Sequence, residues 1–289
     1  MKTIEAIYSP PSMHWVGDGF PVRTLFSYDR MAPKSISPFL LLDYAGPAEF
    51  SPSKKSRGVG QHPHRGFETV TIVYQGELEH RDSSGGGGLI GAGDVQWMTA
   101  GAGIMHEEFH SQEFTRNGGR LEMVQLWVNL PANSKQNPAR YQSILDADIP
   151  KITLGDGVGE VRIIAGIHNG QRGPATTHSF MNVWDVALQT NQKICLPVPA
   201  GHNTLIMVRR GSVLINDHEL VGDAQLAICS QQGEEITLAS SDNAQLLILS
   251  GEAINEPVVG HGPFVMNSRE EIQQAMKDFQ SGRFGMLNT

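Results

Sequence analysis

Residues 60–69, GQHPHRGFET, place two histidines on either side of one proline, followed by a glutamate. His62 and His64 are two positions apart, and side chains at that spacing share one face of a β-strand. His106 and Glu108 form a second pair of this kind within the segment GIMHEEF. If the two strands pair across a barrel, three imidazoles and one carboxylate converge. This set of side chains is typical of a transition-metal site.

The types of side chain restrict the metal and its chemistry. Imidazole suits Fe, Ni, Cu and Zn, and an added carboxylate with open coordination positions suits a catalytic Fe(II) centre. We therefore expect one divalent transition metal, with Fe(II) favoured and Mn, Ni, Co, Cu or Zn as alternatives. Glu68 has the same strand parity as His62 and His64, so either Glu68 or Glu108 could supply the carboxylate. His80 lies near the cluster in sequence but outside both pairs.

The segments around these residues have the composition of β-strands. Residues 69–74 (TVTIVY), 94–99 (DVQWMT) and 121–130 (LEMVQLWVNL) are rich in β-branched and aromatic residues and are bounded by Gly or Pro. Many short strands separated by glycine suggest a sandwich or barrel. Residues 131–142 are polar and flanked by proline, which predicts a linker.

The order strand, Gly, strand, Gly-Asp, strand occurs twice along the chain. Gly211 corresponds to Gly76, and the pair Gly222-Asp223 corresponds to Gly93-Asp94. This weak repeat predicts two similar β-domains, which we place at residues 1–132 and 133–289.

The repeat also predicts that the second domain has no metal site. An ungapped count from the matched glycines gives, for each proposed ligand, the residue at the same place in the second domain. No histidine is retained at any of these places. The residues found there, in the order His62, His64, His106 and Glu108, are Pro197, Pro199, Glu235 and Thr237.

One helix is expected near the end of the chain, at about residues 268–281. Ser268 and Glu271 fit a capping box, in which the two side chains satisfy backbone N–H groups at the helix start. An apolar stripe at helical spacing follows, and Gly282 is a natural stop. The stripe consists of Ile272, Ala275, Met276 and Phe279.

Charge and composition exclude several classes of protein. The net charge of −8 argues against direct nucleic-acid binding, which needs clustered Lys and Arg. The two cysteines, Cys195 and Cys229, lie in apolar stretches and predict buried free thiols in a reducing compartment. The first residues contain no apolar signal-peptide region, and no apolar run approaches the roughly 20 residues that span a bilayer. We expect a soluble cytoplasmic protein.

Several long strings of the sequence resemble the pirin family of the cupin superfamily. They are HPHRGFETVTIV at residues 62–73, GDVQWMTAGAGIMHEEF at 93–109, VQLWVNLP at 124–131 and HGPFVMN at 261–267. The segment SPFLLLDYAGP at residues 37–47 also resembles the family. The resemblance covers most of the chain.

The resemblance implies an all-β bicupin, with two jelly-roll barrels face to face and a metal in the N-terminal barrel. It implies ligands at His62, His64, His106 and Glu108. General cupins take their glutamate from the first motif, which here is Glu68. Because the pirin strings match more closely, Glu108 is the expected ligand, and Glu68 is expected to lie beside the ligands.

Bacterial pirin-like proteins are similar to quercetin 2,3-dioxygenases, so the resemblance implies a quercetinase-type oxidoreductase. The implied reaction opens a flavonol with dioxygen and releases carbon monoxide, with Glu108 as the base for the flavonol hydroxyl. Four side chains could line an apolar mouth or pack in the core: Phe67, Trp97, Met98 and Met105.

Two other functions are compatible with the same cluster. The chain could be an iron-binding redox or metal sensor that acts on transcription through a protein partner, without turnover. It could also keep a metal for stability alone.

Overall fold

The structure is a computed structural model that describes residues 1–287. The chain divides into two compact units. We call the unit built from Ser12–Arg30, Phe39–Asp146 and the residues from Asn255 onward the first barrel. The unit built from Met1–Pro11, Met31–Pro38 and Ala147–Ile254 is called the second barrel.

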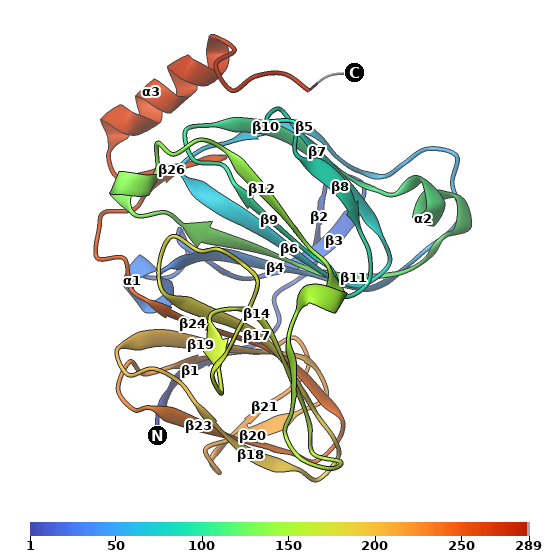
Figure 1. The fold of residues 1–289 in the computed structure, drawn as a ribbon, viewed down its shortest axis with the longest axis vertical. Coiled ribbons are helices and arrows are strands. Elements are labelled where there is room, and N and C mark those ends of the chain that lie inside the picture. The colour runs from blue at the N-terminus through green and yellow to red at the C-terminus, as the bar shows by residue number, and fades with distance from the viewer. Residues whose placement is uncertain (288–289) are drawn as a thin grey trace. The chain divides into compact units, whose positions relative to one another are not determined.

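The first barrel consists of two antiparallel sheets (Figure 1). Seven strands form one sheet in the order β12-β9-β6-β11-β4-β3-β2, and four form the other in the order β5-β10-β7-β8. The bounds are β2 His14–Val16, β3 Phe20–Ser27, β4 Phe39–Phe50, β5 Gly58–His64, β6 Phe67–Gln75, β7 Leu78–Asp82, β8 Gly87–Ile90, β9 Val95–Thr99, β10 Ile104–His110, β11 Gly119–Asn129 and β12 Arg140–Ile144, with α2 at Gln112–Asn117 and a 3-10 turn at Ala132–Ser134.

The second barrel repeats this arrangement. Its sheets have the orders β1-β22-β19-β24-β17-β14-β13 and β18-β23-β20-β21. The bounds are β1 Ile4–Tyr8, α1 Pro33–Ile36, β13 Lys151–Thr153, β14 Gly159–Ala165, β15 Ile167–His168, β16 Gln171–Arg172, β17 Met181–Leu188, β18 Lys193–Pro197, β19 His202–Arg210, β20 Val213–Ile215, β21 Glu219–Val221, β22 Leu226–Cys229, β23 Glu235–Ser240 and β24 Ala244–Glu252.

The two ends of the chain belong to different barrels. β1 pairs with β22 in the second barrel, although it opens the chain. The helix α3 (Arg269–Gln280) contacts β25 (Val259–His261) and β26 (Phe264–Met266) in the first barrel. The compact units therefore differ from the single boundary after residue 132 that the sequence suggested.

Most of the predicted strands are present, and the predicted linker is the main exception. Residues 140–142 belong to β12, which pairs with β9 through Tyr141 and Met98. β12 lies at the edge of the seven-stranded sheet, so the end of the predicted linker is an edge strand. Only the preceding polar stretch forms a 3-10 turn.

The helix α3 forms as predicted. Ser268 accepts a hydrogen bond from the Glu271 backbone, and the Glu271 side chain accepts one from the Ser268 backbone. Ile272 and Ala275 are buried, whereas Met276 and Phe279, the other half of the predicted stripe, are more than a third exposed. Within residues 1–287, no helix is long and apolar enough to cross a membrane.

Both cysteines are free thiols, as predicted, but only one is buried. Cys229 lies in the core of the second barrel, and Cys195 is exposed on β18. The prediction of two buried thiols is wrong for Cys195, because β18 turns alternate side chains outward.

Candidate metal centre

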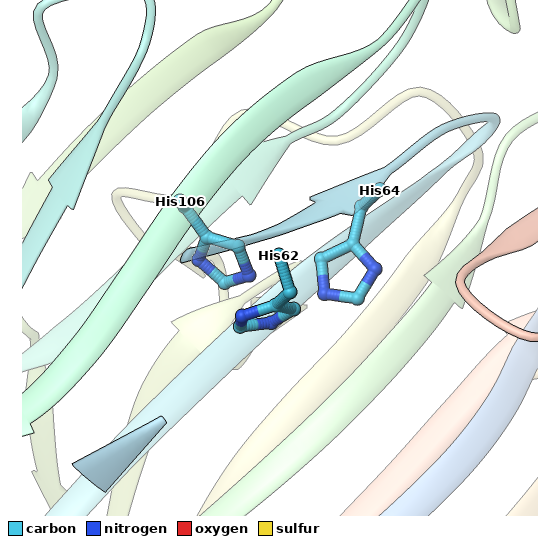
Figure 2. A group of neighbouring side chains, drawn as sticks. All are labelled: His62, His64 and His106. Atoms are coloured by element: carbon cyan, nitrogen blue, oxygen red, sulfur yellow. The ribbon is translucent and has the colours of Figure 1, made fainter. Parts of the chain in front are cut away.

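Three of the predicted ligands meet inside the first barrel (Figure 2). β5 and β10 pair so that His62 lies directly opposite His106, and His64 lies opposite Ile104. The ring centroids are 4.2 Å apart for His62–His106, 4.8 Å for His64–His106 and 4.9 Å for His62–His64. One ring nitrogen from each histidine lies within 4.8 Å of the other two. The strand register alone therefore gathers the three imidazoles.

Burial keeps two of these imidazoles neutral. His106 is fully buried and His64 is 5% exposed. Desolvation holds the pKa of both side chains well below the usual value, and the neighbouring histidines lower it further. A neutral imidazole has one unprotonated nitrogen, which is the form that binds a metal.

Backbone carbonyls orient His62 and His64. The Nδ1 atom of His62 lies 2.8 Å from the carbonyl oxygen of Gly60, and that of His64 lies 3.4 Å from the carbonyl oxygen of Pro263. Because a carbonyl only accepts, Nδ1 must carry the hydrogen in each ring. The lone pair is therefore on Nε2 in both residues.

A chain of three side chains gives His106 the same tautomer. Burial acts to raise the pKa of Asp82, but hydrogen bonds from His80 and Ser84 outweigh this effect and leave that pKa lowered. The ionised Asp82 accepts a hydrogen bond from His80 Nε2 at 3.1 Å. The Nδ1 atom of His80 is then an acceptor for His106 Nδ1–H, at 3.4 Å.

The remaining nitrogen of His106 is the clearest sign of a missing partner. Its Nε2 atom is buried and has no hydrogen-bond partner among residues 1–287. An unsatisfied buried acceptor costs free energy unless something binds it. Three inward nitrogens with lone pairs and no acidic hydrogen are a set that fits a divalent transition metal.

Glu108 lies beside the three histidines but is held by other side chains. Its Oε1 atom accepts hydrogen bonds from Thr71 Oγ1 at 3.1 Å and from Gln96 Nε2 at 3.3 Å. It forms a second group of potential ligands with His80 and His106. Glu108 therefore lies near His106, and its role as the fourth ligand stays a prediction.

Glu68 occupies a different place. It is fully buried and accepts a hydrogen bond from Thr99 Oγ1 at 2.7 Å. Burial raises its pKa from the ordinary value of 4.5 to about 7. It belongs to neither group of potential ligands among the described residues.

A cavity of about 340 Å³ opens onto the site and is lined by His62, His64 and Glu108. None of the four side chains predicted to line an apolar mouth lines this cavity. Phe67 is fully buried behind the cavity wall, where its ring contacts His64 and Trp127. Trp97 and Met98 are fully buried, and Met105 packs against the cluster around Phe264. The apolar walls are Val16, Phe20, Val22, Val59, Met123 and Trp127.

Little in the sequence indicates these wall residues. Val16 lies in β2, and Phe20 and Val22 lie in β3, about forty residues before the histidines. Their sequence pattern indicates only a strand. Asp82 was also missed, although its spacing of two from His80 is the same signal that identified the ligand pairs. The C-terminal helix α3 also contacts this region, because its Asp278 forms an ion pair at 2.6 Å with Arg65, the residue after His64.

The second barrel has apolar residues where the first has ligands. Gly93 and Ala224 both have positive φ, and their N–H groups bond to Val73 and Val208. Ala224 therefore takes the place of Gly93, so the count that matched Gly222 with Gly93 begins two residues early. The second barrel then has one residue fewer before β23, because Leu196 lies opposite Ile236 as His62 lies opposite His106. Pro197 is exposed, and the inward positions fall one residue away from the predicted ones. The residues that face inward are Leu196, Val198, Ile236 and Leu238, all in the apolar core.

In the corrected register, the four inward positions of the second barrel still contain no histidine. Thr71 corresponds to Ile206 and His80 to Ile215 when the count starts from the matched glycines Gly76 and Gly211. Ile215 pairs with Leu238 just as His80 pairs with Glu108, which confirms the register.

The fold and the site define the chain as a two-domain cupin with a histidine cluster in one barrel. Residues 19–128 match the Pirin family, and residues 183–285 match the Pirin C-terminal cupin domain. The chain belongs to the pirin family.

Two relatives and one solved structure show how close the similarity is. A Pseudomonas aeruginosa protein named "Putative quercetin 2,3-dioxygenase" is 58% identical over 98% of this chain and 99% of that protein. A "Pirin-like protein" of Solanum lycopersicum is 38% identical over 93% of this chain and 88% of that protein. The crystal structure of quercetin 2,3-dioxygenase from Acinetobacter baumannii is 55% identical, covers 99% of both chains and gives a TM-score of 0.96.

Proposed function

We propose that the protein is a metal-dependent dioxygenase that opens a flavonol such as quercetin with dioxygen and releases carbon monoxide. The observation that carries the proposal is the buried Nε2 of His106, which has no partner among the described residues and lies beside two imidazoles of the same tautomer. The names of the similar bacterial proteins support the substrate class. We infer that His62, His64 and His106 hold one divalent metal, with Fe(II) favoured and Glu108 as the fourth ligand or a nearby base.

The bound metal would act as a Lewis acid that lowers the pKa of a coordinated hydroxyl. The residues of the chain supply orientation and proton transfer. Glu108 is held at one oxygen by Thr71 and Gln96, so its other oxygen can accept the proton of the flavonol 3-hydroxyl. Asp82 and His80 fix the tautomer of His106 and keep its ring in place.

The walls of the cavity suit an aromatic substrate. Met123 and Trp127 give it apolar faces, and its volume of about 340 Å³ falls at the lower end of the range for small-molecule sites. Apolar walls exclude water from the reacting groups, which favours the binding of an electron-rich ring and protects the deprotonated hydroxyl from reprotonation.

The test compares two adjacent glutamates. The metal-free protein is loaded anaerobically with Fe(II), Mn(II), Co(II), Ni(II) or Cu(II), and quercetin is added in air. Loss of flavonol absorbance and release of carbon monoxide are measured. Glu108→Gln should lower turnover by about 100-fold or more, the usual range for removal of a general base.

Glu107→Gln is the matched control. Glu107 is the neighbour of Glu108 on β10, but its side chain pairs with Arg81 at 2.6 Å instead of facing the cavity. Its turnover should stay close to that of the unmodified protein. Tight metal binding without turnover for any metal would contradict the proposal and favour the sensor function. A metal that changes only the melting temperature would favour a structural role.

A further inference from the structure

The second barrel contains its own cavity, at a place that the metal chemistry does not use. Its volume is about 330 Å³, close to that of the cavity in the first barrel. Its polar lining residues are His168, Asn169, Asn182, Trp184 and Glu234, and the others are apolar. Two of its lining residues, Trp184 and Val198, belong to the apolar core of the barrel together with Leu196 and Ile236.

Two residues that line this cavity carry three buried polar atoms without a hydrogen-bond partner among the described residues. His168 is 3% exposed, and neither of its ring nitrogens forms a hydrogen bond within residues 1–287. The indole Nε1 of Trp184, which is 1% exposed, is also unsatisfied among the described residues. The two rings contact each other at a centroid distance of 4.9 Å. Buried polar atoms of this kind normally bond to a ligand or to ordered water.

The backbone holds His168 in place. It is the last residue of β15, which pairs with β16 through a turn at Asn169 and Gly170. Both turn residues have positive φ, as a tight hairpin requires. Burial lowers the pKa of His168, so its ring is neutral and offers one N–H donor and one acceptor.

Asn182 adds a further donor. Its Oδ1 atom accepts a hydrogen bond from the backbone N–H of Ile167 at 3.0 Å. This bond fixes the orientation of the amide, so its amino group is the end that a ligand would meet. Gly166 is needed beside it, because a Cβ there would lie 2.0 Å from Asn182 Oδ1.

The remaining lining restricts the ligand. Phe180 and Pro199 offer planar apolar surfaces at the rim, which suit an aromatic ring. The lining contains no Lys or Arg, and the carboxylate of exposed Glu234 would repel an anion. An apolar cavity of about 150 Å³ holds a benzene molecule, so this cavity has room for one substituted ring.

We propose that this cavity binds a neutral, single-ring aromatic molecule that carries a hydroxyl and a carbonyl group. The hydroxyl would donate to the acceptor nitrogen of His168. The carbonyl would accept from Trp184 Nε1–H or from the amino group of Asn182. The inference is independent of the proposed dioxygenase activity, because no residue of the first barrel takes part.

A metal is not the expected occupant. The groups of side chains that could hold an ion within residues 1–287 all lie in the first barrel. His168 would be the only imidazole in this cavity, and a single imidazole binds divalent metals weakly. The unsatisfied atoms are also mostly donors, which suit oxygen atoms of an organic ligand.

The test uses NMR of the full-length protein labelled at the indole nitrogen of its four tryptophans. The probe is 4-hydroxyacetophenone, and Trp184→Phe identifies the signal of Trp184. We expect a saturable shift of this signal. The signal of Trp127 reports on binding in the first barrel and should not follow the same titration. The charged analogue 4-hydroxybenzoate should bind at least tenfold more weakly.

Variants locate the binding site. His168→Phe should weaken binding roughly tenfold, because a buried hydrogen bond to the probe is lost. Phe180→Ala removes a half-exposed side chain at the rim, so it weakens binding with less risk to folding. His218→Gln is the control, because His218 is exposed elsewhere on the same barrel and should leave affinity unchanged.

Three outcomes would overturn the inference. The Trp184 signal could stay unmoved up to the solubility limit of the probe, which would mean that the cavity holds water only. Trp127 could move without Trp184, which would assign binding to the first barrel. Folded His168→Phe and Phe180→Ala proteins could both bind as tightly as the unmodified protein.

Discussion

The two barrels have the same strand order and the same pairing but opposite interiors. In the first barrel, His62 and His106 face each other across β5 and β10. In the second, Leu196 and Ile236 face each other across β18 and β23. The backbone thus provides four inward positions in each barrel, and the side chains decide whether they hold a metal site or an apolar core.

The difference has a physical consequence for each barrel. The inward residues of the second barrel bury apolar surface and stabilise it directly. In the first barrel, the Nε2 atom of His106 has no hydrogen-bond partner among residues 1–287, so a bound group is needed to satisfy this buried polar atom. The first barrel buries apolar surface through other residues, among them Val73, Leu121 and Met123.

The largest expected effect comes from making the first barrel resemble the second. His106→Ile removes the imidazole that belongs to both groups of potential ligands. We expect metal content, measured by elemental analysis after dialysis, to fall from one ion per chain to nearly none. The same measurement on His218→Gln should show no loss. A His106→Ile protein that keeps its metal would show that the ion binds elsewhere.

The second effect concerns Glu68, a buried carboxyl group that belongs to neither group of potential metal ligands among the described residues. The pKa of Glu68 is raised from 4.5 to about 7 by burial, so the folded state binds more protons than the unfolded state between these values. The contribution of Glu68 to the free energy of unfolding of the metal-free protein should therefore be largest below pH 4.5 and should decline as the pH rises to about 7. The change is on the order of 3 kcal/mol.

Glu68→Gln should remove this part of the pH dependence. Denaturant unfolding of both metal-free proteins between pH 4.5 and 8 gives the comparison, with the difference between the two curves as the result. If the difference is independent of pH, Glu68 titrates normally in the folded protein.

A third effect tests the chain from Asp82 through His80 to His106. His80→Phe keeps a ring to stack on Tyr141, which lies 5.0 Å away, but removes both hydrogen bonds. Metal affinity should fall by about 10- to 100-fold, the usual cost of losing a partner that orients a ligand. Competition with a chelator measures this change. An unchanged affinity would show that His106 is oriented without His80.

The smallest effect is expected at the matched position of the second barrel. Ile236→Val removes one buried methylene group and should lower the free energy of unfolding by about 1 kcal/mol. Metal content should stay at the value of the unmodified protein. A loss of metal in this variant would show that the two barrels do not act independently.

The sequence predicted the features that depend on local pattern. The histidine pairs, the strands around them and the capping box of α3 could be recognised because each signal lies within a few residues. The resemblance to the pirin family further predicted the two barrels. The residue types of the cluster also indicated its metal chemistry before the strand pairing was known.

Other features depend on contacts that no local pattern records. Val16 and Phe20 line the cavity only because β2 and β3 fold beside β4. The ungapped count between the barrels failed because the connections between matching strands differ in length, as the pairing of Leu196 with Ile236 shows. It also matched Gly222 with Gly93, whereas Ala224 adopts the positive φ of Gly93. The Asn169-Gly170 dipeptide marks a turn, but no local pattern indicates that His168 before it lines a cavity.

The most direct test is a crystal structure of the Fe(II)-loaded protein with anomalous diffraction measured at the iron absorption edge. We predict one peak per chain, within coordination distance of the Nε2 atoms of His62, His64 and His106. A peak at another site, a peak inside the second barrel, or no peak in protein that contains iron would contradict the metal centre.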